Sequence, residues 1–243
     1  MSTTILQTKL IIPLLHPNLV SRSRLTNQLE TGVQFGHKLT LVAAPAGFGK
    51  TTVVSAWVHQ KQRNVAWISL DEDDNEVTVF WVYVIASIRT VLPAFAETAF
   101  TSLMASPPAA LDSILPTLVN ELAGLVVPLV LVLDDYHVIA NREIHDSISF
   151  LLEHQPLQLH LVISTRADPP LPIARIRAQR CLTELRADDL RFTNDEAQTL
   201  LNEMMGLGLT AEDVKVLEKR TEGWGVGLMV LVSVFGKIGD FEG

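Results

Sequence analysis

The chain of 243 residues is 48% hydrophobic and 19% charged, a composition that suits a globular protein with a large core. Its net charge is -8 and its lysines and arginines form no cluster, which argues against nucleic-acid binding by this segment. The single cysteine, Cys181, excludes an intrachain disulfide and fits a reducing, cytoplasmic setting. The first residues lack the pattern of a secretion signal, and the apolar run at 122–133 is too short to span a bilayer.

Strand and helix patterns alternate from residue 38 to about residue 190. Continuous apolar runs predict the strands, and apolar residues at helical spacing predict the helices between them. The expected strands are 38–44, 65–70, 128–137, 159–166 and one within 181–193. The expected helices begin at Lys50 or span 76–92, 111–125 and 144–156, with a loop at 99–110. Because three of the strands do not alternate apolar with polar residues, we expect an α/β fold with a five-stranded, mainly parallel sheet flanked by helices.

The pattern changes to helix alone in the last part of the chain. Thr193 with Glu196, and Thr210 with Asp213, have the spacing of N-terminal helix capping boxes. These boxes predict a small all-helical subdomain at residues 189–243.

The stretch APAGFGKT at 44–51 follows the first predicted strand and opens a helix, which is the context of a phosphate-binding loop. Backbone N–H groups can wrap a β-phosphate there, because Gly47 and Gly49 bring no Cβ atom into the turn. Lys50 can neutralise phosphate oxygens and the Thr51 hydroxyl can bind Mg²⁺. The alternative is a glycine-rich turn that only joins strand to helix, and the agreement of pattern and context argues against it. The residues expected to contact the phosphates are Ala46, Gly47, Phe48, Gly49, Lys50, Thr51 and Thr52.

Two carboxylates end the strand predicted at 129–133, and such strand ends lie beside a phosphate loop in this class of fold. Asp134 would hold Mg²⁺ through water, and Asp135 would polarise the water that attacks the γ-phosphate. His137 is expected to be structural. Arg166 ends the fourth strand at the same edge, where it could sense a γ-phosphate, with an ordinary surface arginine as the alternative.

Five motifs occur in one order along the chain: APAGFGKTT, SLDEDDN at 69–75, VLDDYHVI at 132–139, ISTRADPPLP at 163–172 and RTEGWGVGL at 220–228. With this ordered set the sequence resembles the nucleotide-binding module of MalT-like, LuxR-family transcription activators, within the STAND class of signal-transduction ATPases. The resemblance covers essentially the whole chain. It implies a P-loop NTPase fold, with residues 1–188 as the nucleotide-binding domain and ATP, ADP and Mg²⁺ as its cofactors.

The resemblance also implies residues on the base side of the nucleotide. NLVSRSRL at 18–25 is similar to the family's adenine-side segment, which lies within residues 1–30. The backbone of Val20 and Arg22 would bond the base and Leu25 would pack on it, although the residues alone indicate only a polar turn. Trp224 would close the pocket, next to Gly225, where relatives carry a proline.

The acidic run at 71–74 is expected to be a solvated loop that caps the next helix, with a regulatory role as the alternative. In the family that the sequence resembles, ADP locks the nucleotide domain against the helical subdomain, and ATP with an inducer opens it. The open form self-associates, and slow hydrolysis resets the switch. The resemblance implies that sensor repeats and a helix-turn-helix domain follow, and the uncharged run at 224–236 is either a buried helix or a surface for such a part.

Two other functions remain open at this point. One is a nucleotide-binding oligomerisation module without significant hydrolysis. The other is a P-loop phosphotransferase, which would need an acceptor site and a basic lid that the sequence does not indicate.

Overall fold

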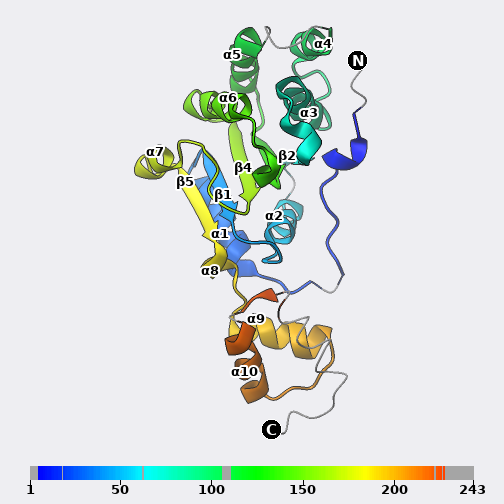
Figure 1. The fold of residues 1–243 in the computed structure, drawn as a ribbon, viewed down its shortest axis with the longest axis vertical. Helices are drawn as coiled ribbons and strands as arrows, with labels where there is room; N and C mark the ends of the chain where they lie inside the picture. The colour runs from blue at the N-terminus through cyan, green and yellow to red at the C-terminus, as the bar shows by residue number, and fades with distance from the viewer. Residues whose placement is uncertain are drawn as a thin grey trace.

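The computed structural model describes residues 5–17, 19–61, 63–105, 111–221, 223–225 and 227. At its centre is a sheet of five strands in the order β2-β3-β4-β1-β5, and each neighbouring pair is parallel (Figure 1). The strands are β1 (Leu39–Ala43), β2 (Asn64–Ser69), β3 (Leu129–Asp134), β4 (Leu159–Thr165) and β5 (Leu182–Arg186). The predicted five-stranded, mainly parallel sheet is confirmed.

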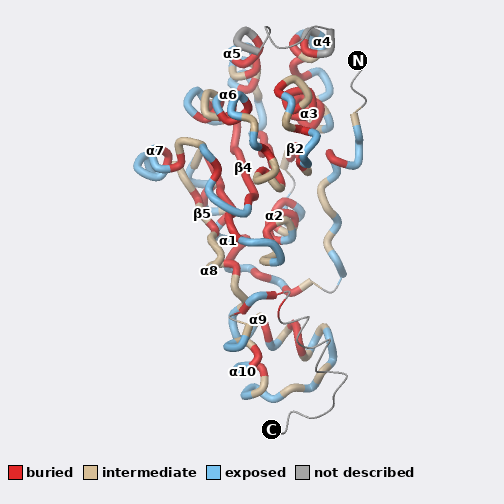
Figure 2. The backbone as a smooth tube through the Cα atoms, viewed as in Figure 1, coloured by how far each residue is buried: buried red, intermediate tan, exposed pale blue. Residues whose placement is uncertain are grey.

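Helices cover both faces of the sheet, which explains why every residue of β1, β3 and β4 is buried (Figure 2). Val42 packs on one face with residues of α1 and α2, whereas Leu41 packs on the other face with residues of α3 to α6. The helices around the sheet are α1 (Ser23–Gln34), α2 (Lys50–His59), α3 (Val77–Arg89), α4 (Glu97–Ala105), α5 (Leu111–Ala123), α6 (Arg142–Glu153), α7 (Ile173–Ala178) and α8 (Ala187–Leu190).

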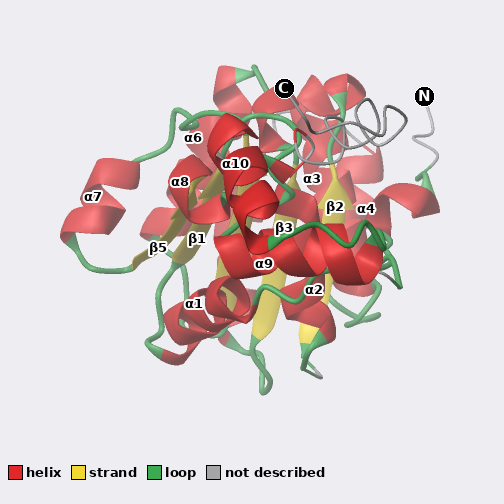
Figure 3. Cartoon of the chain, turned by 90° about the horizontal axis from the view of Figure 1, so that it is seen from below, coloured by secondary structure: helices red, strands yellow, loops and turns green. Residues whose placement is uncertain are grey.

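Up to residue 227, the regular elements that the structure describes after α8 are all helical, and they lie beyond one end of the sheet (Figures 1 and 3). They are α9 (Asn194–Gln198), the π-helical segment η4 (Thr199–Met204) and α10 (Ala211–Thr221). Both predicted capping boxes are present: the Thr193 side chain accepts a hydrogen bond from the Glu196 N–H, and the Thr210 hydroxyl accepts one from the Asp213 N–H. Of the predicted uncharged run 224–236, only Trp224, Gly225 and Gly227 lie within the described residues.

Two local predictions were wrong. The predicted loop at 99–110 is helical up to Ala105, because Ala99 and Leu103 are buried in the core beside α3; residues 106–110 lie outside the described part. The acidic run is exposed at Asp71, Glu72 and Asp73, but most of it forms the 3-10 helix η2 (Glu72–Asn75), in which Asp74 is fully buried and bonded to Lys9. Asp71 caps η2, and Glu76 instead caps the following α3.

The N-terminal segment, residues 5–17 and 19–22, runs along the β2 side of the molecule before α1 begins (Figure 1). It contains the 3-10 helix η1 (Gln7–Leu10), which contacts β2 and α3. Lys9 of η1 reaches Asp74, and the Pro13 carbonyl accepts a hydrogen bond from the Ser55 hydroxyl of α2. Among the described helices, none combines the length and the apolar character needed to cross a membrane.

Candidate functional site

The loop between β1 and α2 turns at two glycines. Gly47 has a φ of 81° and Gly49 a φ of 76°, a backbone conformation that strains any residue with a Cβ atom. Lys50 is the first residue of α2, so the free N–H groups of the first helical turn face the loop. The loop and the helix end together present a concave set of backbone donors, as an anion site requires.

Lys50 is buried at this turn, where its Nζ donates to the carbonyl oxygen of Pro45 at 3.1 Å. Burial lowers the pKa of the Lys50 ammonium, and the nearby Arg166 lowers it further, whereas the carboxylates of Asp135 and Asp134 act in the opposite direction. A desolvated ammonium with a single neutral acceptor is a group that phosphate oxygens would bind strongly.

Asp134, the last residue of β3, lies beside the loop. Its carboxylate accepts hydrogen bonds from the Thr51 hydroxyl, at 2.9 Å to Oδ2, and from the Ser164 hydroxyl of β4. Burial raises the pKa of Asp134, while these two hydroxyl donors lower it. The three strands β1, β3 and β4 therefore bring their carboxyl ends to one point, as the sequence predicts for neighbouring parallel strands.

Asp135 and Arg166 lie at the same edge of the sheet. Asp135 has the left-handed backbone conformation, with a φ of 57°, and its side chain is about half exposed at 47%. The ring Nδ1 of His137 lies 3.6 Å from Asp135 Oδ1, and burial lowers the pKa of that imidazole. Arg166 directly follows β4 and is exposed.

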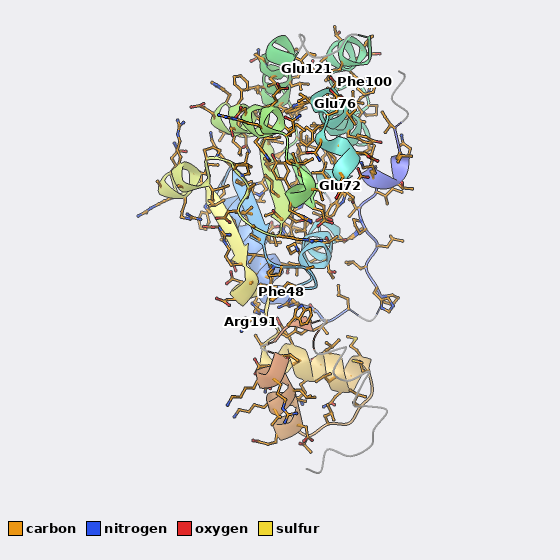
Figure 4. The ribbon with its side chains drawn as sticks, in the orientation of Figure 1. Phe48, Glu72, Glu76, Phe100, Glu121 and Arg191 are labelled. Carbon is orange, nitrogen blue, oxygen red and sulfur yellow. The ribbon has the colours of Figure 1, made fainter. Side chains whose placement is uncertain are left out.

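Several of these groups line a cavity of about 780 Å³. Lys50, Asp135 and Arg166 line it together with the whole stretch from Ala46 to Val53. Figure 4 labels Phe48 and Arg191, which lie in the region where the sheet meets the later helices. A volume of this size suits a ligand as large as a nucleotide.

The opposite wall of the cavity comes from the N-terminal segment and from the helices after β5. Val20 and Arg22 line the cavity, as the resemblance implies, and Val20 also packs with the apolar residues of the helical part. The guanidinium of Arg22 lies 4.4 Å from the ring centre of Phe192, which also lines the cavity.

Two of the proposed base-side residues lie elsewhere. Leu25 is fully buried between α1 and α2, in the same hydrophobic cluster as Val53, and is not among the cavity-lining residues. The ring of Trp224 lies 6.5 Å from that of Phe48, and the neighbouring Gly225 lines the cavity instead.

Sequence reasoning did not identify a further group of cavity-lining residues. They are His16, Leu19, Phe192, Leu200, Met204 and Met205. Leu200 and Met204 belong to η4 and Met205 follows it, and apolar residues in a helix predict core packing as readily as contact with a ligand. No local pattern could have distinguished these two outcomes.

The residues fit a magnesium ion that is bound together with a nucleotide. Within the described ranges there is no group of three or more His, Cys, Asp or Glu side chains that would hold a metal by itself. Mg²⁺ commonly uses one or two protein oxygens and completes its shell with phosphate oxygens and water. The Thr51 hydroxyl and the Asp134 carboxylate, already in contact, provide that limited protein set.

Comparison with known proteins matches residues 20–164 to the AAA ATPase domain family. The match contains the loop at 44–51 and both acids, and it ends before Arg166. The chain is 35% identical over 227 residues to the HTH-type transcriptional regulator MalT of Yersinia enterocolitica, and 34% identical over 227 residues to that of Serratia proteamaculans. These alignments cover 93% of this chain and 25% of each relative, so the chain spans about a quarter of their length.

Solved structures show the same fold at low sequence identity. A Walker-type ATPase of Pyrococcus abyssi superimposes with a TM-score of 0.52 and 12% identity, over 93% of this chain and 70% of that one. Drosophila ORC bound to DNA gives a TM-score of 0.56 and 13% identity, over 96% of this chain and 60% of that one.

Proposed function

The chain belongs to the AAA ATPase domain family, and from this premise we propose that it binds ATP and ADP in the 780 Å³ cavity as the nucleotide switch of a MalT-like STAND regulator. The observation that carries the proposal is the meeting of Lys50, Asp135 and Arg166 around one cavity next to the loop at 44–51. Two cations and a set of backbone donors complement a polyphosphate, and a carboxylate beside them can act on water.

Each polar side chain next to the loop at 44–51 has a proposed role. Lys50 binds the β- and γ-phosphate oxygens, and Asp135 orients the attacking water and draws its proton. Arg166 reads the γ-phosphate, which ATP has and ADP lacks. Thr51 and Asp134 hold the Mg²⁺ ion, which when bound neutralises phosphate charge. In this proposal hydrolysis is slow and resets the switch to the ADP-bound form.

The base of the nucleotide occupies the opposite wall in this proposal. The backbone of Val20 and Arg22 bonds the adenine, and the apolar surface of Leu19, Phe192 and Met204 covers it. Leu25 supports this wall from the core, and Trp224 closes it through its contact with Phe48.

The division into a nucleotide-binding domain, residues 1–188, and a helical subdomain, residues 189–243, is part of the same proposal. It is supported by the separate hydrophobic cluster of the later helices. Arg22 and Arg24 both bond the carboxylate of Glu196, at 3.1 and 2.9 Å, and we name this set the arginine clamp. The clamp is a small polar connection that ADP-bound protein keeps and ATP-bound protein breaks.

The opened form self-associates, and in a full-length regulator this controls transcription in the cytoplasm through the sensor and helix-turn-helix domains implied by the resemblance. The direct test is calorimetry with ADP, ATP and GTP in the presence of Mg²⁺, combined with light scattering of each complex. We expect binding of both adenine nucleotides and a larger mass only with ATP. Absence of adenine-nucleotide binding would refute the function, and equal masses with ATP and ADP would refute the switch.

A further inference from the structure

We propose that Asn75 is a positioning residue for Asp135, an inference that rests on the proposed ATP hydrolysis. Asn75 is the last residue of η2 and lies on a different strand connection from the two acids. Its amide Nδ2 donates to the carbonyl oxygens of Val138, at 2.9 Å, and Glu72, at 3.0 Å. Its Oδ1 accepts from the N–H groups of Ala140, at 2.6 Å, and Asn141, at 3.2 Å. The side chain thus uses both donors and both acceptor sites, and three of the four bonds reach residues 138–141.

The bonds from Asn75 hold the end of the turn that Asp135 begins. The carbonyl oxygen of Asp135 accepts a hydrogen bond from the Val138 N–H at 3.1 Å, which closes the 3-10 helix η3 (Tyr136–Val138). The Val138 carbonyl then accepts from Asn75. Asp135 and Asn75 are therefore connected through one short, hydrogen-bonded turn.

This turn needs external support, because Asp135 is not a glycine and has a φ of 57°. A left-handed conformation at such a residue costs of the order of 1 kcal/mol or more and persists only where surrounding contacts enforce it. The Asp135 N–H donates to the Ser164 hydroxyl at 3.0 Å, and the Tyr136 hydroxyl bonds the His145 ring at 2.9 Å. These contacts hold the start and the middle of the turn, and Asn75 holds its end.

Asn75 itself is placed by a rigid neighbour. Asp74 is fully buried, accepts the Lys9 ammonium at 2.6 Å and accepts the Asp71 N–H at 2.9 Å. The Asn75 carbonyl also accepts from the Asn141 side chain at 2.9 Å. Because its backbone is held in this way, the Asn75 side chain can keep the Asp135 turn in one position. A side chain on a mobile loop could not do so.

The test compares Asn75→Ala with the unchanged chain in single-turnover ATP hydrolysis and in ATP and ADP binding. Loss of the four bonds lets the Asp135 turn relax, and a displacement of that kind is expected to slow hydrolysis by roughly tenfold. Asn75 does not line the cavity, so both dissociation constants should stay within about twofold, since a tenfold change would correspond to about 1.4 kcal/mol of binding free energy. Asn75→Asp keeps the two acceptor bonds but turns a carboxylate oxygen, which cannot donate, toward the carbonyl oxygens of Val138 and Glu72, so it should also slow hydrolysis.

Gln155→Ala is the matched control. Gln155 also donates to two backbone carbonyls, those of Lys38 and Leu159, both at 2.8 Å, but at the opposite ends of the strands. It should lower the midpoint of thermal unfolding and leave the hydrolysis rate unchanged, because a general loss of stability does not move Asp135.

The outcomes are distinguishable. A normal rate in Asn75→Ala, while Asp135→Ala is slow, overturns the positioning role and leaves the proposed function intact. A rate loss in Gln155→Ala equal to that in Asn75→Ala also overturns it. If Asn75→Ala does not fold, a normal rate in Asn75→Asp overturns the role and a reduced rate supports it. No hydrolysis by the unchanged chain overturns the positioning role together with the proposed hydrolysis, whereas nucleotide binding is tested separately by the calorimetry described above.

Discussion

The two walls of the cavity are built in different ways. The wall proposed to bind phosphate consists of one continuous stretch, residues 46–53, and of residues at the ends of two adjacent buried strands. The wall proposed to bind the base is assembled from residues 16–22 and from helices that begin about 170 positions later, held by apolar packing and the arginine clamp.

The difference indicates which wall can move. Displacing the phosphate wall would break the parallel pairing of β1, β3 and β4, which is the centre of the fold. Moving the later helices away from residues 16–24 would break the bonds of Arg22 and Arg24 to Glu196 and to the backbone at 189–191, together with the apolar packing of Val20. We therefore infer that substrate chemistry belongs to a rigid wall and nucleotide-dependent motion to a movable one.

The largest expected effect is on the rigid wall. Lys50→Ala removes charge-assisted hydrogen bonds to the phosphates, and two bonds of roughly 2 kcal/mol each correspond to about a 1,000-fold loss of affinity for ADP. Isothermal titration calorimetry measures this loss of ADP affinity. Lys61→Ala, an exposed lysine that pairs with Glu30, is the control and should bind normally. Tight ADP binding by Lys50→Ala would contradict the assignment of this wall.

Asp135→Ala separates hydrolysis from binding on the same wall. Loss of a positioned general base is expected to reduce the single-turnover rate about 100-fold. The affinity for ATP should change little, because the phosphates contact the loop and Lys50. Quenched-flow measurement of phosphate release gives the single-turnover rate. The control is Asp168→Ala, which removes an exposed carboxylate that pairs with Arg186. Equal rates would favour a module that binds nucleotide without significant hydrolysis.

Acid should lower the stability of the sheet, in which His160 is buried, while the arginine clamp stays ionised. Burial, helped by the nearby His37 and Arg63, lowers the pKa of His160 from 6.5 to about 4, although its hydrogen bond to the His37 backbone acts in the opposite direction. The unfolded chain therefore takes up this proton first, so the stabilisation is complete above about pH 6.5 and is lost as the pH falls towards 4. The loss at pH 5 is about 2 kcal/mol of unfolding free energy from this group.

Urea unfolding at pH 7 and pH 5 measures that loss, and His160→Gln, which does not titrate, should show a smaller pH dependence. The pKa of Glu196 is lowered by its bonds from Arg24 and the Thr193 backbone, against the effect of burial, so the clamp stays ionised in this window. The same pH dependence in both proteins would show that His160 is not responsible.

Arg166→Ala should change discrimination more than affinity. One charge-assisted bond that only ATP can accept is worth about 1.4 kcal/mol or somewhat more, so the preference for ATP over ADP should fall about tenfold. Competition between labelled nucleotides gives the ratio of dissociation constants. Arg175→Ala, at an exposed arginine away from the cavity, is the control. An unchanged ratio of the two dissociation constants would show that Arg166 does not distinguish ATP from ADP.

The smallest effect is expected on the movable wall. Glu196→Ala frees both arginines of the clamp, and a partly exposed ionic network of this kind contributes roughly 1 kcal/mol or less to the closed form. ADP affinity should fall only a few-fold, while the radius of gyration of the ADP complex increases in X-ray scattering. Glu203→Ala, an exposed carboxylate on η4, should alter neither quantity. Unchanged scattering would mean that the clamp does not hold the two parts together.

The sequence alone determined the strands and the loop at 44–51. Continuous apolar runs predict buried parallel strands, and the Gly-X-Gly-Lys-Thr stretch predicts an anion site, because each property depends on residues that are neighbours in the chain. Asp134, Asp135 and Arg166 could be predicted at one edge for a related reason: parallel strands end on the same side.

Only the tertiary structure decided the burial of Asp74 and the makeup of the base wall. Asp74 looked solvated within an acidic run, yet Lys9, 65 positions away, pairs with it in the interior. Leu25 was expected on the base and lies in the core, whereas Phe192 and Met204 line the cavity. Such outcomes depend on which distant segments meet, and since the free energy of those contacts is spread over the whole fold, no local pattern of residues records it.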